Sequence, residues 1–211
     1  MKTFKLIVFA MALSFAFNVS AQVEKLPQPK FPTDMSLMNC LNERRTIRDF
    51  VEEEISVQEI ANMLWAAYGV NRPEESKLTV PSARNVQEID VYLFTEKGVY
   101  IYNSYEHTIE LIQEGDYRAK ISSQKHFSVA PVSVVLVANY GRMKGFDKES
   151  LEFYSAIDCG YVSQNIYLYC ASSERMGTVA CGAINRDEIS TILGLKNAKP
   201  LLAHPFGVAT R

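Results

Sequence analysis

Three arginines lie close together early in the chain, at Arg44, Arg45 and Arg48, in the segment Arg-Arg-Thr-Ile-Arg-Asp-Phe at 44–50. Guanidinium groups this close repel one another unless a multiply charged anion or several carboxylates hold them. The planar fork of arginine suits a phosphate monoester in particular. The alternative is an ordinary solvated surface, with the arginines paired to the three glutamates at 52–54.

Three further segments carry polar and small residues in a fixed order after this cluster. Pro-Ser-Ala-Arg-Asn-Val-Gln at 81–87 lies in a long loop just before an expected strand. Asp-Cys-Gly-Tyr-Val-Ser-Gln-Asn at 158–165 lies on an expected long helix, and Met-Gly-Thr-Val-Ala-Cys-Gly-Ala at 176–183 follows that helix. A loop as long as 70–88 inside a compact domain is more often functional than idle.

The four segments in this order, with Leu-Trp-Ala-Ala-Tyr-Gly-Val-Asn-Arg at 64–72, resemble the nitroreductase family of flavin mononucleotide (FMN) enzymes over nearly all of residues 37–208. Among its members, the chain is most similar to the short single-domain branch that includes azoline-oxidising dehydrogenases. The resemblance implies an α+β fold: a central mixed or antiparallel sheet flanked by helices, with a long central dimerisation helix. It also implies a homodimer with two FMN sites at the interface.

The resemblance assigns cofactor-binding roles to several residues. In the family, the arginine segment binds the phosphate, the ribityl chain and the pyrimidine edge of FMN, which corresponds here to Arg44, Arg45, Thr46 and Arg48. Thr46 replaces the commoner serine and keeps the hydroxyl. The family's Pro-Ser-x-x-Asn segment lines the flavin, often from the partner subunit, and corresponds to Pro81, Ser82, Ala83 and Asn85. Gln87 and Glu88 replace the Gln-Pro of many relatives.

The resemblance also implies roles for a loop and for the last residue of the sequence. Backbone N–H groups near the flavin N5 come from the loop after the long helix, here Gly182 and Ala183, and a fixed dipole there can tune the redox state of the flavin. Many relatives close on the phosphate with a basic pair near the C-terminus, and Arg211 is the candidate here.

The resulting functional hypothesis is an FMN-dependent oxidoreductase that needs no catalytic side chain, because the flavin carries out the chemistry. It would transfer hydride or electrons to or from a small, flat organic molecule, of nitroaromatic or quinone type in vitro, with NAD(P)H as a possible donor. Two alternatives remain open at this stage. One is a non-catalytic exported protein that binds flavin or another ligand on the same fold, and the other is a structural exported domain whose arginines only pair with glutamates.

Residues 1–21 have the pattern of a secretory signal peptide. Lys2 and Lys5 form a basic start, 6–17 is an apolar run too short for a comfortable membrane span, and Ser-Ala-Gln at 20–22 suggests cleavage before Gln22. We therefore expect an exported, periplasmic protein of bacterial type with no stable membrane span after cleavage. The alternative is an uncleaved anchor.

The rest of the chain suits one domain. Without Lys2 and Lys5, 20 basic residues face 24 acidic ones, a net charge of about −4, and no motif favours nucleic acid. Residues 22–35 contain three prolines and read as an extended arm, and 36–211 forms the FMN-binding domain. The four cysteines and three histidines show no metal-ligand spacing, and buried free thiols are expected in preference to disulfides.

Apolar periodicity predicts the elements of the domain. Helices are expected at 36–43, from the Ser-Val-Gln-Glu capping box at 56–59 to Gly69, at 149–175 and at 185–194. Strands are expected at 89–94, 99–102, 132–137 and 201–208. In the long helix, a stripe of small residues would let another helix approach, either within the monomer or from a second chain: Ala156, Cys159, Gly160 and Ser163.

The signal pattern makes a direct prediction about the mature protein. When the full sequence is expressed in a bacterium with its own export machinery, the protein should fractionate outside the cytoplasmic membrane. N-terminal sequencing should begin at or near Gln22. An intact Met1 on protein recovered from the cytosol would contradict the signal-peptide interpretation.

Overall fold

The computed structural model describes residues 22–30 and 34–210, so the predicted signal segment and Arg211 lie outside the described residues. The core is a seven-stranded sheet in which every pairing of neighbouring strands is antiparallel, in the order β1-β6-β5-β4-β7-β9-β8. In chain order its strands are β1 (Val23–Lys25), β4 (Ile89–Thr95), β5 (Gly98–Asn103), β6 (Thr108–Glu114), β7 (Val132–Asn139), β8 (Met176–Thr178) and β9 (Ala198–Val208).

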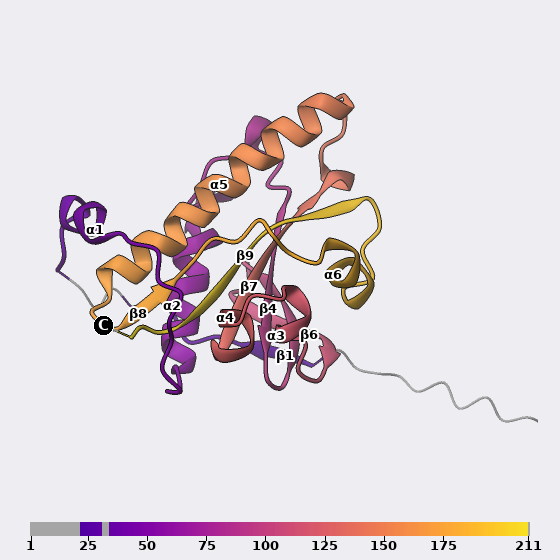
Figure 1. Cartoon of the computed structure of the whole chain (residues 1–211). Helices are drawn as coiled ribbons and strands as arrows, with labels where there is room; N and C mark the ends of the chain where they lie inside the picture. The colour runs from indigo at the N-terminus through magenta and orange to yellow at the C-terminus, as the bar shows by residue number, and fades with distance from the viewer. Residues whose placement is uncertain (1–21, 31–33, 211) are drawn as a thin grey trace, which may run out of the picture.

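Helices cover both faces of the sheet (Figure 1). One face carries α2 (Val57–Tyr68) and the long α5 (Lys148–Ser172), and the other carries α3 (Arg118–Ile121), α4 (His126–Val129) and α6 (Arg186–Ile192). Alternate side chains of the central strands enter the two cores, because successive residues of a strand point to opposite faces. In β4, Val91 and Leu93 face α2 and α5, while Tyr92 and Phe94 face the other layer.

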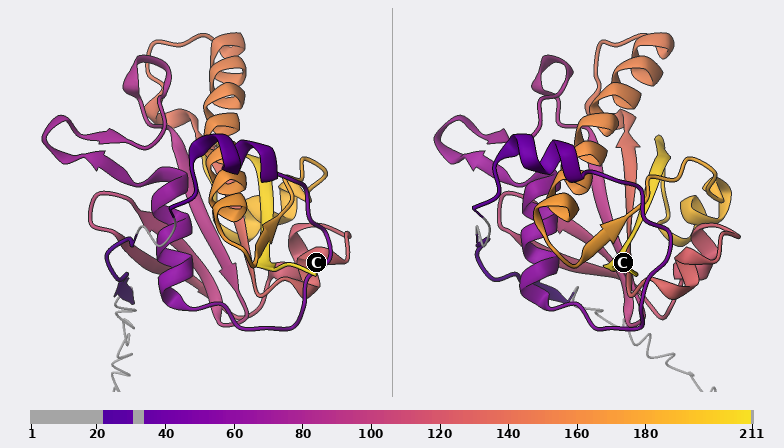
Figure 2. Two further views of the ribbon diagram at one scale, coloured as in Figure 1. Left: turned by 90° about the vertical axis from the view of Figure 1, so that its left-hand side faces the viewer. Right: turned by 60° about the vertical axis from the view of Figure 1, so that its left-hand side comes forward.

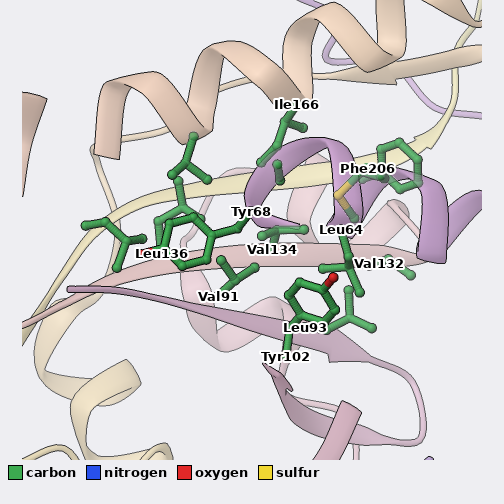
Figure 3. Close-up of a cluster of buried hydrophobic side chains, with 14 of the residues drawn as sticks. Leu64, Tyr68, Val91, Leu93, Tyr102, Val132, Val134, Leu136, Ile166 and Phe206 are labelled. Carbon is green, nitrogen blue, oxygen red and sulfur yellow. The ribbon is translucent and has the colours of Figure 1, made fainter. Parts of the chain in front are cut away.

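The core beneath α2 and α5 is shown in Figure 3, where Leu64 and Tyr68 of α2 and Ile166 of α5 meet Val134 and Leu136 of β7. All five side chains are buried. Because β4 and β7 are covered on both faces, their sequences are nearly continuous apolar runs. The same burial holds α5 rigidly across the sheet.

Most predicted elements are present, with shifted ends. The capping box at Ser56 and Glu59 starts α2, and the long helix ends at Ser172, three positions before the predicted Arg175. The strand predicted at 201–208 begins earlier, at Ala198, and the helix predicted at 185–194 is shorter. The prediction did not include β1, β6, β8, α3 or α4, which are short or amphipathic.

The loop at 70–88 is more ordered than its sequence suggested. It contains a small hairpin of β2 (Val70–Arg72) and β3 (Lys77–Leu78) and two 3-10 turns, η1 (Pro73–Glu75) and η2 (Ala83–Asn85). Trp65 is half-buried at the base of this hairpin and donates a hydrogen bond to the Val70 carbonyl at 3.1 Å. The hairpin projects from the body in Figure 2.

Two helices leave apolar side chains uncovered. In α1 (Leu37–Glu43), Leu37, Met38 and Leu41 are 64%, 71% and 46% exposed. In α5, an outward face of the N-terminal half is also exposed, formed by Phe153, Tyr154, Ile157 and Tyr161. The small-residue stripe is divided: Cys159 and Ser163 are buried, whereas Ala156 and Gly160 belong to the outward face.

The arm at 22–30 lies against the domain. Its β1 pairs with β6, and the Pro27 carbonyl lies 2.9 Å from Nε2 of His107, which is itself buried. All four cysteines are buried free thiols, as expected. Among the described residues, no helix is both long enough and apolar enough to span a bilayer.

Candidate functional site

The arginine segment runs from the end of α1 along the edge of the sheet. Ile47 donates its N–H to the Thr178 carbonyl of β8 at 2.9 Å, and Phe50 forms an isolated bridge with Ala209. Ile47 packs so closely on Gly177 that a Cβ at that glycine would lie 3.0 Å from its side chain. This contact fixes the backbone between Thr46 and Arg48 against β8.

Tyr167 of α5 joins this segment to the loop after β8. Its ring lies under the Arg44 guanidinium, with Cζ 5.2 Å from the ring centroid. Its hydroxyl lies 3.1 Å from Oγ1 of Thr46 and accepts a hydrogen bond from the Ala180 N–H at 2.8 Å. Below the ring, His204 makes an edge contact at 5.7 Å. One side chain therefore positions both the arginine segment and the start of the loop.

The arginines do not pair with the glutamates that follow them. Among the described residues, Arg45 forms an ion pair with Glu43, while Arg44 and Arg48 form none. Glu53 pairs instead with Arg175. The structural alternative, in which this cluster is neutralised by residues 52–54, is therefore wrong. Two guanidinium groups at this edge are left without a carboxylate.

Arg48 lies near the loop that contains Gly182 and Ala183. Its charge is felt by Cys181 and His126: burial, and then the positive charge of Arg48, lowers the pKa of His126. Burial raises the pKa of the Cys181 thiol, and Arg48 opposes that shift. Sγ of Cys181 is 3.4 Å from Nε2 of His126, which packs the loop against α4.

The loop itself is held by its carbonyl groups. The Gly182 carbonyl accepts from Nη2 of Arg186 at 2.9 Å, and the Ala183 carbonyl accepts from Oγ of Ser122 at 2.9 Å. Both residues are exposed, and within the described part of the chain their N–H groups form no hydrogen bond. Two fixed donors are thus offered to solvent on the side of the molecule that carries Arg48.

The segment 81–87 is tightly constrained. Arg84, Asn85 and Gln87 have φ values of 51°, 56° and 52°, in the left-handed region that non-glycine residues rarely adopt. Such conformations persist only where surrounding contacts enforce them, and they cluster at functional sites. Ser82 and Asp158 make two of these contacts: Oγ of Ser82 accepts from the Gln87 N–H at 2.9 Å, and Oδ2 of Asp158 accepts from the Ala83 N–H at 2.8 Å.

The two halves of the predicted site lie at different positions along α5. Tyr167 holds the arginine segment and Asp158 holds the 81–87 segment, nine residues apart, which is about 14 Å along a helix axis. In Figure 2, α1 lies beside the C-terminal half of α5 and η2 lies toward its other end. Through Tyr167 and Cys181, the structure therefore brings Arg44, Thr46 and Arg48 near the loop that contains Gly182 and Ala183. The segment of Pro81, Ser82, Ala83 and Asn85 is held apart from them within one chain, at Asp158.

Sequence reasoning missed the residues that position these segments. Tyr167 carried no signal, because an isolated tyrosine on a long helix is usually a packing residue. Asp158 and Asn165 were noticed as part of a helix motif, and their spacing of seven places both on one face. Asn165 uses that face to donate to the Ala66 carbonyl at 2.9 Å, which ties α5 to α2.

Replacing Tyr167 with phenylalanine should test the link between α5 and the loop. The change removes the acceptor of the Ala180 N–H, which should cost about 0.5–1.5 kcal/mol in the free energy of unfolding by urea. Hydrogen exchange at Ala180 should quicken in Tyr167→Phe. The matched control is Tyr169→Phe, which removes a hydrogen bond of the same helix to the Glu59 carbonyl, at 3.2 Å, and should leave exchange at Ala180 unchanged. Equal effects of both variants on exchange at Ala180 would contradict the link.

Comparison with known proteins bears on this arrangement. A model of the nitroreductase family matches residues 41–208. The chain is 32% identical over 184 residues to a protein of Methanocaldococcus jannaschii provisionally named a nitroreductase, covering 82% of this chain and 91% of that protein. A crystal structure from Ralstonia eutropha JMP134, also provisionally named a nitroreductase, superposes with a TM-score of 0.84 at 34% identity and covers 90% of both chains.

A more distant structure shares the fold. The Escherichia coli microcin synthetase McbBCD complex contains a chain that superposes with a TM-score of 0.71 at 16% identity, covering 98% of this chain and 85% of that one. At this identity the likeness concerns the fold alone. The family model and the two relatives above 30% identity carry the assignment: the chain belongs to the nitroreductase family, a family of flavin-dependent oxidoreductases.

Proposed function

We propose that the protein is a homodimeric, FMN-dependent oxidoreductase that transfers hydride or electrons between its flavin and a small, flat organic substrate. One observation carries this proposal. Arg44 and Arg48, which have no carboxylate partner among the described residues, lie at the same edge as the N–H groups of Gly182 and Ala183, which have no acceptor there. A phosphate monoester joined to a polar ring system would satisfy both.

The residues present fit the cofactor. Arg44 and Arg48 would neutralise the phosphate, and the Thr46 hydroxyl, already oriented by Tyr167, would donate to or accept from the sugar-alcohol chain. The N–H groups of Gly182 and Ala183 would orient the polar edge of the ring. When bound, FMN supplies hydride and single-electron transfer, which no side chain at this edge could provide. Arg211 remains a candidate for the phosphate, although it lies outside the described residues.

A second copy of the chain would complete the site. Pro81, Ser82, Ala83 and Asn85 are held about 14 Å along α5 from the residues that Tyr167 positions, so they would serve the flavin of the partner subunit. The exposed apolar side chains of α1 and of the outward face of α5 support this arrangement, because contiguous apolar surface of this kind marks interaction sites. Gly160 leaves open space there for a close helix neighbour.

Residues 1–21 support export, and an exported enzyme would meet little NAD(P)H. The electron donor in that compartment would then be another reductant, while NAD(P)H or dithionite would serve in vitro. We expect a nitroaromatic compound or a quinone to accept the electrons. A protein whose bound flavin is reduced but passes electrons to no acceptor would instead be the non-catalytic flavin-binding protein considered above.

The arginine assignment predicts a loss of cofactor affinity. In a titration followed by flavin fluorescence, the parent should bind FMN in the micromolar range or tighter. Arg44→Ala and Arg48→Ala should each lose a charge-assisted contact worth roughly 1.5–3 kcal/mol. The dissociation constant should therefore rise by about tenfold to over a hundredfold.

Arg72→Ala provides the matched control, because Arg72 is an exposed arginine of the β2–β3 hairpin away from the proposed phosphate. Its affinity for FMN should equal that of the parent. A parent that binds no FMN would contradict the proposed function. Unchanged affinity in both Arg44→Ala and Arg48→Ala would remove these two residues from the site.

The shared site predicts that two defective chains can complement each other. One chain carries Arg44→Ala with Arg48→Ala, and the other carries Ser82→Trp, which fills the space that the loop leaves for the flavin. Each alone should bind FMN weakly. After unfolding and refolding as an equal mixture, about half of the dimers should be mixed, and each has one intact site by twofold symmetry, so about a quarter of parental FMN sites should return. No recovery in confirmed mixed dimers would place each site within a single chain.

A further inference from the structure

Glu88 carries a fully buried carboxyl group. It is the residue directly before β4, its side chain is 0% exposed, and neither carboxyl oxygen has a hydrogen-bond partner among the described residues. A carboxylate buried in this way would be strongly unfavourable. A protonated Glu88 can instead donate a hydrogen bond.

Asp158 is the acceptor available to it. The Asp158 side chain is 4% exposed and near enough to act on Glu88. Asp158 raises the pKa of Glu88, whereas a hydrogen bond with Glu88 lowers that of Asp158, which favours Glu88 as the donor and Asp158 as the acceptor. The other Asp158 contact is the Ala83 N–H, at 2.8 Å from Oδ2. A single proton between the two carboxyls would therefore complete a chain from Glu88 through Asp158 to the backbone of the 81–87 segment.

Among the described residues, no other neighbour neutralises Glu88 or donates a hydrogen bond to it in place of this proton. Arg142 lies close enough to act on Glu88 electrostatically, but its hydrogen bonds go to Asp90, at 2.6 Å, and to the Gln87 carbonyl, at 3.0 Å. Tyr68 of α2 faces Glu88 with a buried, neutral hydroxyl, and Cys159 of α5 faces it with a buried thiol. Burial and, after it, the nearby carboxyls together raise the pKa of that thiol to about 12, so it stays protonated.

The segment that Asp158 holds is the one under backbone strain. Three residues of 84–87 have left-handed backbone angles, which persist only where surrounding contacts enforce them. Three contacts hold the backbone of this segment in place: the Ala83 N–H to Asp158, the Gln87 N–H to Ser82, and the Gln87 carbonyl to Arg142. Turn hydrogen bonds of Asn85 and Val86, side-chain bonds of Gln87 and the Arg84 contact with the Phe146 ring add to them. Loss of the contact between Ala83 and Asp158 would release the end of the segment that carries Ser82 and Ala83.

We propose that Glu88 and Asp158 share one proton and act as positioning residues, holding the 81–87 segment in the shape in which it lines the flavin of the partner subunit. This inference rests on the proposed function. Neither carboxyl touches the cofactor: Glu88 acts through Asp158, and Asp158 acts through the Ala83 backbone. Loss of the proton places two negative charges together in a buried site, which loosens the segment and weakens FMN binding.

The direction of the pH dependence follows from the environment of the pair. Burial, with Asp158 beside it, raises the pKa of Glu88 from 4.5 to about 7, and burial also raises the pKa of Asp158. The apparent pKa near 7 belongs to loss of the last proton from the pair. Because the folded state holds a proton that the unfolded state releases near pH 4.5, the contribution is complete below that pH. It is lost as the pH rises through about 7.

The experiment compares the parent with Glu88→Gln by FMN titration between about pH 5.5 and 8.5. Parental affinity should fall by up to about tenfold per pH unit above pH 7, the limit for one linked proton. Glutamine keeps a donor toward Asp158 that cannot ionise, so Glu88→Gln should lack this fall. In Asp158→Asn, the asparagine amide is a permanent N–H donor toward Glu88, so this variant should also lack the fall in affinity. Glu74→Gln, an exposed carboxyl of η1, should follow the parent.

A second readout does not need the cofactor. In the FMN-free protein, the protection of the Ala83 amide against hydrogen exchange should decrease in the parent as the pH rises through about 7 and stay constant in Glu88→Gln. Ionisation of the FMN phosphate, which occurs near pH 6 for a phosphate monoester, strengthens binding as the pH rises and is common to all variants. The ratio of variant to parent affinity therefore reports only the effect of the Glu88–Asp158 pair on FMN binding.

The outcomes separate this inference from the proposed function. If the parent binds FMN at no pH, the proposed function fails, and this inference fails with it. If the parent binds FMN but Ala83 protection is constant across the pH range, the shared proton is overturned while the proposed function stands. An alkaline fall in affinity that persists unchanged in both Glu88→Gln and Asp158→Asn would overturn it in the same way.

Discussion

The rigid spacing of side chains along α5 is the constraint on which the candidate site depends. The helix is held across the sheet by buried residues such as Val162 and Ile166, so its two functional side chains cannot approach each other. Tyr167 fixes the arginine segment and the loop at Ala180, and Asp158 fixes Ala83. Because nine residues separate the two, one chain presents two half-sites, and only a second copy can bring complementary halves together.

The chemistry of each half follows from what is left unsatisfied. At the edge of β8, the Ile47 N–H bonds to the Thr178 carbonyl, whereas among the described residues no carboxylate pairs with Arg44 or Arg48 and no acceptor takes the N–H groups of Gly182 and Ala183. The fold therefore holds positively charged side chains and fixed N–H dipoles close together at this edge. An anionic, planar cofactor is the kind of ligand that would recover the free energy lost in leaving them unpaired.

In the other half of the site, the carboxyl groups of Glu88 and Asp158 are buried rather than exposed. Both lie next to the 81–87 segment, and the strain of Arg84, Asn85 and Gln87 is balanced by hydrogen bonds that include the one from Ala83 to Asp158. This chain would restrain that part of the backbone through a hydrogen bond that depends on a proton.

The sequence by itself determined the elements whose signals are local. The capping box at Ser56, the apolar runs of β4 and β7 and the length of α5 all appear in the amino-acid order, because they reflect short-range periodicity. The order of four short motifs also identified the family and selected Arg44, Thr46, Arg48, Gly182 and Ala183, which the structure then brought to one edge. Short elements such as β8 were missed, since three residues carry no period and form a strand only through pairing with β9.

Only the tertiary structure decided which residues support the site. The cation–π contact of Arg44 with Tyr167, the absence of glutamate partners for Arg44 and Arg48, and the contact of Glu88 with Asp158 all join residues that are 70 or more positions apart or depend on which neighbours are missing. Neither a distant contact nor a missing neighbour can be read from residues that are adjacent in the sequence. The proton affinity of Glu88 is the clearest case, because the same carboxyl on an exposed turn would be an ordinary surface charge. Its burial, which only the packed fold creates, turns it into a candidate hydrogen-bond donor.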